Sequence, residues 1–299
     1  MLWIFEKDNL LPGDDHLQEV LRNSGVPFKE LTKTEIYVYS NDNLCYDVIF
    51  KQHYPGMVRG SVNFCLMCRG NHFLSNGVYY WPEVYKTTNY TTILGDDYLN
   101  SDHVLVQWGN LKHSDYRMYL DNLMENNPAF CRPVSGSKQF SGQIVSLIND
   151  KVCDKLDPLN ILKSDDLLLF SPVKSVLCEW RFVVCKGKVI AGSKYQPYSE
   201  ALIPDTYAPC EPWIYAQKII DRLVGDYYTN EEGNLACLVE DLFTLDICLA
   251  ESNQKSPRFL VPSDVCFKVV EVNSFSAAGL YECNLQAIID SIGVSLVQS

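Results

Sequence analysis

The stretch Glu179–Tyr195 constrains the fold more than any other part of the sequence, because it predicts a charged β-hairpin. Two β-rich runs flank a Lys-Gly-Lys turn, which is the pattern of two antiparallel strands joined by a short connection. Side chains alternate along a strand, so Glu179, Arg181 and Val183 share one face of the first strand. We expect Lys194 to return near them from the second strand. Alternatively, these charges line the solvated face that many hairpins have.

A Gly/Ser loop upstream of the hairpin adds two candidate site residues. The strand expected at 129–133 contains Arg132, and the loop at 134–142 carries Lys138 at its tip. Backbone N–H groups of such a loop can approach a phosphate closely, and a lysine supplies a point charge. The loop lacks the Gly-Lys-Ser/Thr ending and the following helix of a P-loop. An ordinary hairpin loop fits the same residues.

An apolar strand expected at 167–170 ends at Ser171-Pro172, directly before the hairpin. Proline cannot continue a central ladder, so the chain turns or lies at a sheet edge here. The break leaves backbone N–H and C=O groups free. Groups of this kind are what an adenine edge needs for hydrogen bonding.

Two acids interrupt apolar strands further along the chain. Asp246 lies in the strand expected at 242–250, and Glu271 lies in the strand expected at 265–273. A carboxylate in a buried strand costs free energy unless a partner satisfies it. If the strands are antiparallel neighbours, both acids and Asn273 could converge on one cation, and oxygen ligands suit Mg²⁺. The other interpretation is that each acid pairs with an arginine or a lysine.

The N-terminal segment predicts an α/β arrangement. A strand at 2–5, a helix at 14–23 and a strand at 28–31 follow one another, and we expect a third strand near 35–39. No Gly-x-Gly-x-x-Gly sequence follows the first strand, so the fingerprint of a dinucleotide-binding fold is absent. Further strands are expected at 61–67, 77–81 and 104–108.

Helical periodicity predicts three more helices. The first spans 114–125, with Tyr116, Tyr119, Leu120 and Leu123 on its buried side. The second begins near Pro212 and ends at Gly225, and the third spans 284–292. The aromatic cluster Tyr79, Tyr80, Trp81 and Tyr85 is interpreted as packing, with a binding platform as the alternative.

Charge and cysteine content limit the partners and the compartment. The formal net charge of −12 disfavours non-specific adhesion to nucleic acid or to anionic membranes, although it leaves room for a local basic groove. The twelve cysteines accompany neither a secretory signal nor a long apolar run. We therefore expect reduced thiols in a cytoplasmic protein with no membrane association and no obligate protein partner.

Taken in order, several stretches resemble the ATP-grasp superfamily over roughly residues 100 to 295. They are Phe130-Cys-Arg-Pro with the loop Ser135-Gly-Ser-Lys-Gln-Phe-Ser-Gly142, Leu168-Leu-Phe-Ser-Pro-Val173, Glu179-Trp-Arg with Gly192-Ser-Lys-Tyr195, Leu245-Asp246-Ile, and Val270-Glu-Val-Asn273 with Gly279-Leu-Tyr281. The chain is most similar to a clade, common in phages and bacteria, that is marked by two arginines and a lysine and is proposed to act in RNA repair. Arg132, Lys138 and Arg181 look like those three residues.

The resemblance implies an α+β fold in which two α+β subdomains clasp ATP. It places this ATP-grasp domain at 101–299, preceded by a small α/β domain at 1–100. The implied cofactors are ATP and Mg²⁺. Two departures are visible: Arg132 stands where the family usually has a lysine, and the spacing between Asp246 and Glu271 is long.

The resemblance also implies roles for individual residues. Arg132 would contact the α- and β-phosphates of the nucleotide, and Lys138 would lie in the loop that closes over them. Pro172 and Val173 would lie near the adenine, and Glu179 would meet the ribose. Arg181 and Lys194 would face the triphosphate or the acceptor. Arg181, Lys138 and Lys194 are the implied catalytic residues. Asp246, Glu271 and Asn273 would hold one or two Mg²⁺ ions.

The function implied is that of an ATP- and Mg²⁺-dependent ligase acting on RNA ends in RNA repair. One alternative is a carboxylate–amine ligase that makes a peptide or modifies a small molecule through an acylphosphate. Another is a nucleotide-binding protein that has lost catalysis. The implied partners are therefore ATP together with RNA ends or with a small-molecule carboxylate or amine acceptor.

Overall fold

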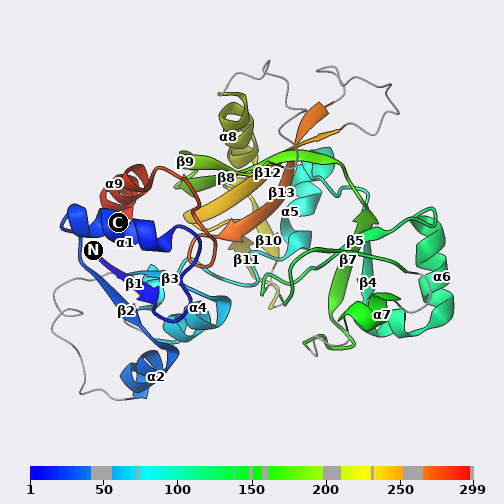
Figure 1. Cartoon of the computed structure of the whole chain (residues 1–299), viewed down its shortest axis with the longest axis horizontal. Helices are drawn as coiled ribbons and strands as arrows, with labels where there is room; N and C mark the ends of the chain where they lie inside the picture. The colour runs from blue at the N-terminus through cyan, green and yellow to red at the C-terminus, as the bar shows by residue number, and fades with distance from the viewer. Residues whose placement is uncertain are drawn as a thin grey trace.

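Three larger β-sheets and a two-stranded ribbon organise the described part of the chain (Figure 1). The computed structural model describes residues 1–41, 56–71, 74–137, 139–147, 151–156, 161–197, 210–229, 232–251 and 265–296. Within those residues no helix is both long enough and apolar enough to cross a membrane. The predicted mixture of helices and sheets is confirmed.

The N-terminal sheet is parallel, with the strand order β2-β1-β3. Its strands are β1 (Leu2–Glu6), β2 (Phe28–Leu31) and β3 (Gly56–Arg59). Helix α1 (Asp14–Asn23) connects the first two strands and buries Leu17 and Leu21, as its periodicity predicts. The α/β opening expected from the sequence is therefore present.

Two strands expected in this region are helices instead. The residues expected as a strand near 35–39 belong to α2 (Lys33–Asn41), where Glu35 accepts a hydrogen bond from the backbone N–H of Thr32 and the Thr32 hydroxyl accepts one from the N–H of Glu35. This reciprocal pair is a capping box. The expected strand at 61–67 is α4 (Val62–Arg69), whose first turn is capped by the Ser61 hydroxyl.

The expected strand at 77–81 is also wrong. A 3-10 turn, η1 (Ser75–Gly77), is followed by extended chain that joins no sheet. Its backbone bonds to a loop near the C-terminus instead, since the N–H of Tyr79 donates to the Ser276 hydroxyl. Tyr80 and Tyr85 from the aromatic cluster are buried and stacked, so the packing interpretation fits them, whereas Trp81 is exposed.

The smaller antiparallel sheet has the order β4-β7-β5-β6 and lies to the right in Figure 1. Its strands are β4 (Val104–Gln107), β5 (Ala129–Pro133), β6 (Gln143–Val145) and β7 (Leu167–Pro172), and it packs with η3 (Trp108–Lys112), α6 (Ser114–Leu123) and α7 (Lys151–Leu156). Helix α6 was expected to bury Tyr119 and Leu123, but both are exposed. The helix turns Arg117, Leu120 and the following Met124 inward.

The larger antiparallel sheet has the order β13-β12-β8-β9 and forms the centre of the molecule. Strands β8 (Val176–Cys185) and β9 (Lys188–Pro197) are the predicted hairpin, and β12 (Leu242–Glu251) and β13 (Val265–Ser274) are the strands with the acids. Helix α8 (Glu211–Leu223) packs on β9 and β12, and α9 (Leu285–Leu296) packs on β8 and β9.

The remaining elements link these layers. Helix α5 (Thr87–Leu94) contacts β13 and α8, and η2 (Gly95–Asp97) follows it; β10 (Tyr227–Thr229) and β11 (Leu235–Cys237) form the ribbon. The first and last helices, α1 and α9, lie side by side (Figure 1). The N-terminal sheet also shares an apolar cluster with the sheet that carries the acids, in which Trp3 of β1 lies with Val183 of β8.

Candidate functional site

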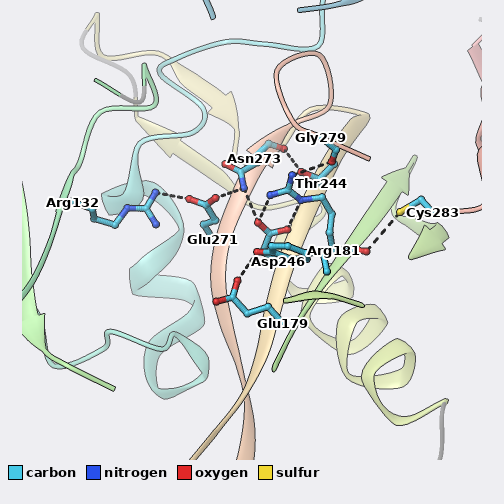
Figure 2. Close-up of polar contacts among 10 residues, drawn as sticks. Arg132, Glu179, Arg181, Thr244, Asp246, Glu271, Asn273, Gly279 and Cys283 are labelled. Atoms are coloured by element: carbon cyan, nitrogen blue, oxygen red, sulfur yellow. Dashed lines mark hydrogen bonds and ion pairs between the residues drawn. The ribbon is translucent and has the colours of Figure 1, made fainter. Parts of the chain in front are cut away.

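A row of polar side chains crosses the larger sheet at one level. The strand register pairs Ser193 of β9 with Arg181 of β8, Arg181 with Asp246 of β12, and Asp246 with Glu271 of β13. Directly paired residues of an antiparallel sheet project from the same face. The two acids, which lie on strands separated by a long connection, therefore meet as neighbours (Figure 2).

Arg181 and Asp246 form a bidentate ion pair in the interior. Arg181 Nε lies 2.7 Å from Asp246 Oδ1, and Nη2 lies 2.5 Å from Oδ2. Both side chains are buried. Burial lowers the pKa of Arg181, but the charge and hydrogen bonds of Asp246 raise it above its ordinary value. The two groups form a salt bridge in which each helps to compensate the burial of the other.

Glu271 reaches a second arginine that comes from the other sheet. Arg132 of β5 donates through Nη2 to Glu271 Oε2 at 2.7 Å. Asn273 bridges the two acids, because its Nδ2 lies 3.1 Å from Asp246 Oδ2 and 2.6 Å from Glu271 Oε1. Figure 2 shows the resulting chain of contacts from Arg132 through Glu271 and Asn273 to Asp246 and Arg181. This chain joins the two antiparallel sheets across the gap between them.

Two tyrosines complete the site on the β9 side. The Tyr195 hydroxyl donates to Glu179, and its ring stacks on that of Tyr281 with 4.6 Å between centroids. The Arg181 guanidinium lies 5.3 Å from the Tyr195 centroid and 5.1 Å from that of Tyr281. Tyr281 has a left-handed backbone with φ of 49°. Such a conformation in a bulky residue costs free energy and is typical of constrained sites.

Two adjoining cavities open between the antiparallel sheets. One, of about 270 Å³, is lined by Ser135 and Ser141 of the Gly/Ser loop together with Arg132, Glu179, Tyr195 and Glu271. The other, of about 530 Å³, reaches residues 173–176, at the connection from β7 to β8 and the start of β8, and also touches Asn100. Arg132 and Glu179 line both. The combined space has the size and the few convergent polar groups typical of a ligand site.

The residues predicted for the site do not all fall there. Arg132, Glu179, Arg181, Asp246, Glu271 and Asn273 are brought together, and Val173 lines the 530 Å³ cavity. Pro172 instead lines a separate hollow of about 730 Å³ next to the connecting segment. Lys138 and the loop at 252–264 lie outside the described residues.

Lys194 is placed on the opposite face of the sheet from the acids. The register pairs it with Trp180, whereas Arg181 pairs with Ser193, and its side chain is exposed. Because the register shifts between Glu179 and Trp180, Tyr195 rather than Lys194 lies on the same face as Glu179 and bonds it. The expectation that Lys194 returns near Arg181 is therefore wrong, because alternation places neighbouring residues on opposite faces.

The oxygen donors fit a divalent cation that also binds phosphate. Among the residues described here, no group of three His, Cys, Asp or Glu side chains could hold a metal ion. Asp246, Glu271 and the Asn273 amide supply three oxygen-bearing groups, and Mg²⁺ commonly takes few protein ligands and completes its octahedron with phosphate and water. The donor set therefore suits Mg²⁺ bound together with a nucleotide better than a cation held by protein alone.

Comparison with solved structures identifies the fold. D-cycloserine synthetase DcsG is similar with a TM-score of 0.59 and 12% identity, over 100% of this chain and 99% of that one. A RimK domain protein ATP-grasp from Sphaerobacter thermophilus DSM 20745 is similar with a TM-score of 0.54 and 11% identity, over 92% of each chain. No curated protein matches the sequence. At these identities the likeness establishes the ATP-grasp fold alone.

The family comparison agrees with this fold. The model that matches residues 113–291 describes an ATP-grasp domain, family 2 of the clade named for two arginines and a lysine. That range includes both antiparallel sheets apart from β4 and contains every residue of the polar row. The chain therefore belongs to the ATP-grasp superfamily, in family 2 of its two-arginine, one-lysine clade.

Proposed function

We propose that this chain is an ATP- and Mg²⁺-dependent ligase whose active site is the polar row and the cavity above it. ATP-grasp enzymes use ATP and Mg²⁺. The observation that carries the proposal is the direct pairing of Asp246 with Glu271 beside two arginines, next to a cavity between two sheets that Arg132 and Glu271 line. A structural ion pair alone does not require two acids, two arginines and an amide to converge directly behind a cavity wall.

The two cavities suggest how the nucleotide lies. The base would occupy the 530 Å³ cavity, beside the segment 173–176 that lines it. The phosphates would occupy the 270 Å³ cavity, beside Arg132 and the serines of the Gly/Ser loop. Glu179 lines both cavities and would meet the ribose between them. Lys138 is proposed to close over the phosphates from the same loop.

Asp246, Glu271 and Asn273 would hold Mg²⁺, which neutralises phosphate charge during group transfer. In the structure the Asn273 amide donates through Nδ2 to both acids. To hold Mg²⁺, Asn273 would present its amide oxygen in place of Nδ2, which a half-turn of the amide group provides. Arg132 is within reach of the phosphate cavity and would turn from Glu271 toward the phosphates. Exchange of Arg132 for Mg²⁺ on Glu271 would keep the charge of this acid compensated, while Arg181 stays on Asp246.

The chemistry asks the protein mainly for positioning and for charge stabilisation. Arg132 and Arg181 keep their positive charge although they are largely buried, because the neighbouring acids more than offset the lowering of their pKa values by burial. They would stabilise the negative charge that develops as a phosphoryl or nucleotidyl group leaves ATP. The stacked tyrosines restrict the directions from which an acceptor can approach Arg181.

The proposed acceptor is an RNA end, in keeping with the clade's two arginines and lysine. The net charge of −12 favours a second candidate, a carboxylate that is phosphorylated and then attacked by an amine, because a long polyanion is repelled by an acidic protein. The two candidates release different products. Adenylation of a 5′-phosphate leaves pyrophosphate and then AMP, whereas acylphosphate formation leaves ADP and then phosphate.

Nucleotide binding is tested first by thermal shift. Wild type, Glu271→Gln and the exposed control Glu19→Gln are heated with ATP, GTP or ADP, each with and without Mg²⁺. A ligand at 100 times its Kd stabilises the native state by about 2.7 kcal/mol. We expect a Mg²⁺-dependent shift with ATP in wild type and Glu19→Gln that is weakened in Glu271→Gln. No shift at millimolar nucleotide in wild type would contradict the proposed function.

Acceptor identity is tested by product analysis with wild type and Asp246→Asn. AMP formed only with RNA that carries 5′-phosphate and 3′-hydroxyl ends would support RNA joining. ADP and phosphate formed only when a carboxylate and an amine are both present would support the second candidate. ATP binding with neither product, across broad acceptor pools, would favour a nucleotide-binding protein that has lost catalysis.

A further inference from the structure

The loop after β13, residues 275–281, is held on the site side by Arg181. Arg181 Nη1 donates to the Gly279 carbonyl at 3.0 Å, while Nε and Nη2 hold Asp246 (Figure 2). Three of the guanidinium donors therefore have fixed partners. Because a guanidinium is planar, the position of the Gly279 carbonyl helps to decide the plane in which Arg181 meets Asp246.

The same loop is also held by Arg59, at the end of β3 in the N-terminal sheet. Arg59 Nη1 donates to the Phe275 carbonyl and Nη2 to the Ala278 carbonyl, each at 2.7 Å. Its Nε donates to Asp14 Oδ1 at 2.6 Å, and its guanidinium lies 4.7 Å from the Phe275 ring centroid. Arg59 and Asp14 are fully buried. The loop is thus clamped between two buried arginines.

Further bonds from the N-terminal region fix the loop backbone. The Gly60 N–H donates to the Ser276 carbonyl at 2.9 Å, the Tyr79 N–H donates to the Ser276 hydroxyl at 2.9 Å, and the Leu280 N–H donates to the Pro12 carbonyl at 2.8 Å. The carbonyl that orients Arg181 follows directly after the one that Arg59 holds. Any movement at Ala278 is therefore passed through a single peptide unit to Gly279.

We propose that Arg59 is a positioning residue for the active site, which acts by fixing the 275–281 loop so that Gly279 orients Arg181 on Asp246. This inference rests on the proposed function for its effect on nucleotide binding. It assigns the N-terminal sheet a part in shaping the site, although none of the described residues of that sheet lines the two site cavities. A merely structural role would make Arg59 a buried charge that holds Asp14 and the loop, with no specific effect on Arg181.

A double-mutant cycle separates the two roles. Arg59→Lys keeps a positive charge opposite Asp14 but cannot bond both loop carbonyls. The variants are Arg59→Lys, Arg181→Lys and their combination. The matched control is Arg117→Lys, alone and with Arg181→Lys, because Arg117 of α6 is also buried and bonds a backbone carbonyl, that of Leu111 in η3. Circular dichroism selects a temperature at which every variant is folded.

The readout of the cycle is the Kd for ATP with Mg²⁺. We expect Arg59→Lys to weaken binding about tenfold and Arg117→Lys by less than twofold. Because Arg59 acts through Arg181, the combined variant should bind within twofold of Arg181→Lys alone. Multiplication of the two single effects, or an Arg59→Lys effect no larger than that of the control, would overturn the inference.

A second readout does not need nucleotide. The Arg181 Nε–H signal in ¹⁵N NMR, assigned by its loss in Arg181→Lys, reports the bond to Asp246. We expect this proton to exchange with solvent at least tenfold faster in Arg59→Lys than in wild type, and at the wild-type rate in Arg117→Lys. Equal rates in all three would overturn the inference. If wild type binds no nucleotide, the proposed function fails while this measurement still decides the role of Arg59.

Discussion

At the scale of single residues, the site depends on acids and arginines that compensate one another's burial. Asp246 is 1% exposed and bonds Arg181 through both of its oxygens. Removing one member of such a pair leaves a buried charge without its counter-charge, which typically costs about 3–5 kcal/mol. The same residues that would hold Mg²⁺ therefore also stabilise the fold before any nucleotide arrives.

We expect Asp246→Asn to lower the free energy of unfolding by about 3 kcal/mol, because the Arg181 guanidinium loses its counter-charge while staying buried. Urea denaturation followed by circular dichroism measures this change. The control is Asp290→Asn, an exposed carboxyl on α9 that bonds Gln286, for which the expected change is within about 0.5 kcal/mol. A loss below about 1 kcal/mol for Asp246→Asn would show that Arg181 finds another partner.

Glu240 gives a pH dependence with a definite sign. Burial raises its pKa to about 7 from an ordinary 4.5, although bonds from the Tyr85 hydroxyl and the charge of Arg69 lower it. The folded protein therefore holds this proton more tightly than the unfolded chain. The resulting stabilisation is fully present below the unfolded value and is lost as the pH rises through about 7.

We expect the free energy of unfolding of the wild type to fall by at most about 3 kcal/mol between about pH 5 and about pH 8, because Glu240 loses its proton in this range. We expect this fall to be absent in Glu240→Gln. Urea denaturation of wild type and variant at both pH values measures the difference. Glu282→Gln, which changes an exposed acid, should keep the wild-type decline. Equal slopes for wild type and Glu240→Gln would mean that the Glu240 carboxyl is ionised throughout this range.

The sequence anticipated the residues that regular geometry brings together. Arg181, Asp246, Glu271 and Asn273 follow from strand alternation and from the cost of burying a carboxylate, and their convergence needed only that β12 and β13 be neighbours. The place of Lys194 could not be foreseen, because a register shift in the hairpin decides which residue of β9 faces Glu179. A bulge of this kind leaves no composition signal in the flanking residues.

At the scale of elements, the errors come from short apolar runs whose ends carry helix signals. Thr32 with Glu35 is a capping box, and Ser61 caps α4, yet the apolar residues after them fit the pattern of a strand. Helix and strand cannot be separated by periodicity in runs this short. The capping residues are the sequence signal that indicates a helix here, because their hydroxyl and carboxylate groups bond the first N–H groups of a helix.

The Gly/Ser loop is packed on the aromatic segment, and this gives a test of its conformation. A Cβ added at Gly136 would lie 2.2 Å from the carbonyl oxygen of Pro82, and the Tyr80 hydroxyl donates to the Gly136 carbonyl. We expect Gly136→Ala to displace the loop, to destabilise the protein by about 1–3 kcal/mol and to weaken ATP binding. Urea denaturation and the thermal shift with ATP and Mg²⁺ measure the two effects.

The control for that change is Gly293→Ala. Gly293 lies inside α9 with open space where its Cβ would be, so alanine should stabilise the protein by about 0.5–1 kcal/mol and leave nucleotide binding unchanged. Unaltered stability and ATP binding in Gly136→Ala would mean that the loop moves away from Pro82 at little cost.

The two faces of β9 give a second test at this scale. Tyr195 bonds Glu179 in the cavity, whereas Lys194 is exposed on the other face. We expect Lys194→Ala to leave the Kd for ATP within twofold of wild type, and Tyr195→Phe to weaken binding because Glu179 loses its hydroxyl partner. Isothermal titration calorimetry with ATP and Mg²⁺ measures both. The reverse order of effects would favour the original expectation for Lys194.

At the scale of the whole molecule, the proposed division at residue 100 does not separate two cores. One apolar cluster joins Leu2, Val58 and Phe64 from the N-terminal segment with Phe182 and Leu245 from the larger sheet. A second cluster joins Trp3, Leu17 and Leu21 with Val183 and with α9. The smaller sheet, by contrast, packs a cluster whose members all come after residue 100. The sequence reveals where the parallel sheet gives way to antiparallel sheets. It does not reveal that apolar side chains from both regions are buried in the same clusters.

We therefore expect residues 101–299, produced alone, to lack a cooperative unfolding transition, because the larger sheet would expose the apolar side chains that the N-terminal segment covers. In the full chain, Leu17→Ala should lower the stability of the larger sheet as well as that of α1, by about 2–5 kcal/mol in one shared transition. Urea denaturation followed by circular dichroism, with hydrogen exchange in β8 and β12 as a local probe, tests both. A cooperative 101–299 fragment, or exchange in β12 unaffected by Leu17→Ala, would mean that the two regions are stable independently. The Arg59 clamp on the 275–281 loop would then have to act through its hydrogen bonds alone, without support from the shared core.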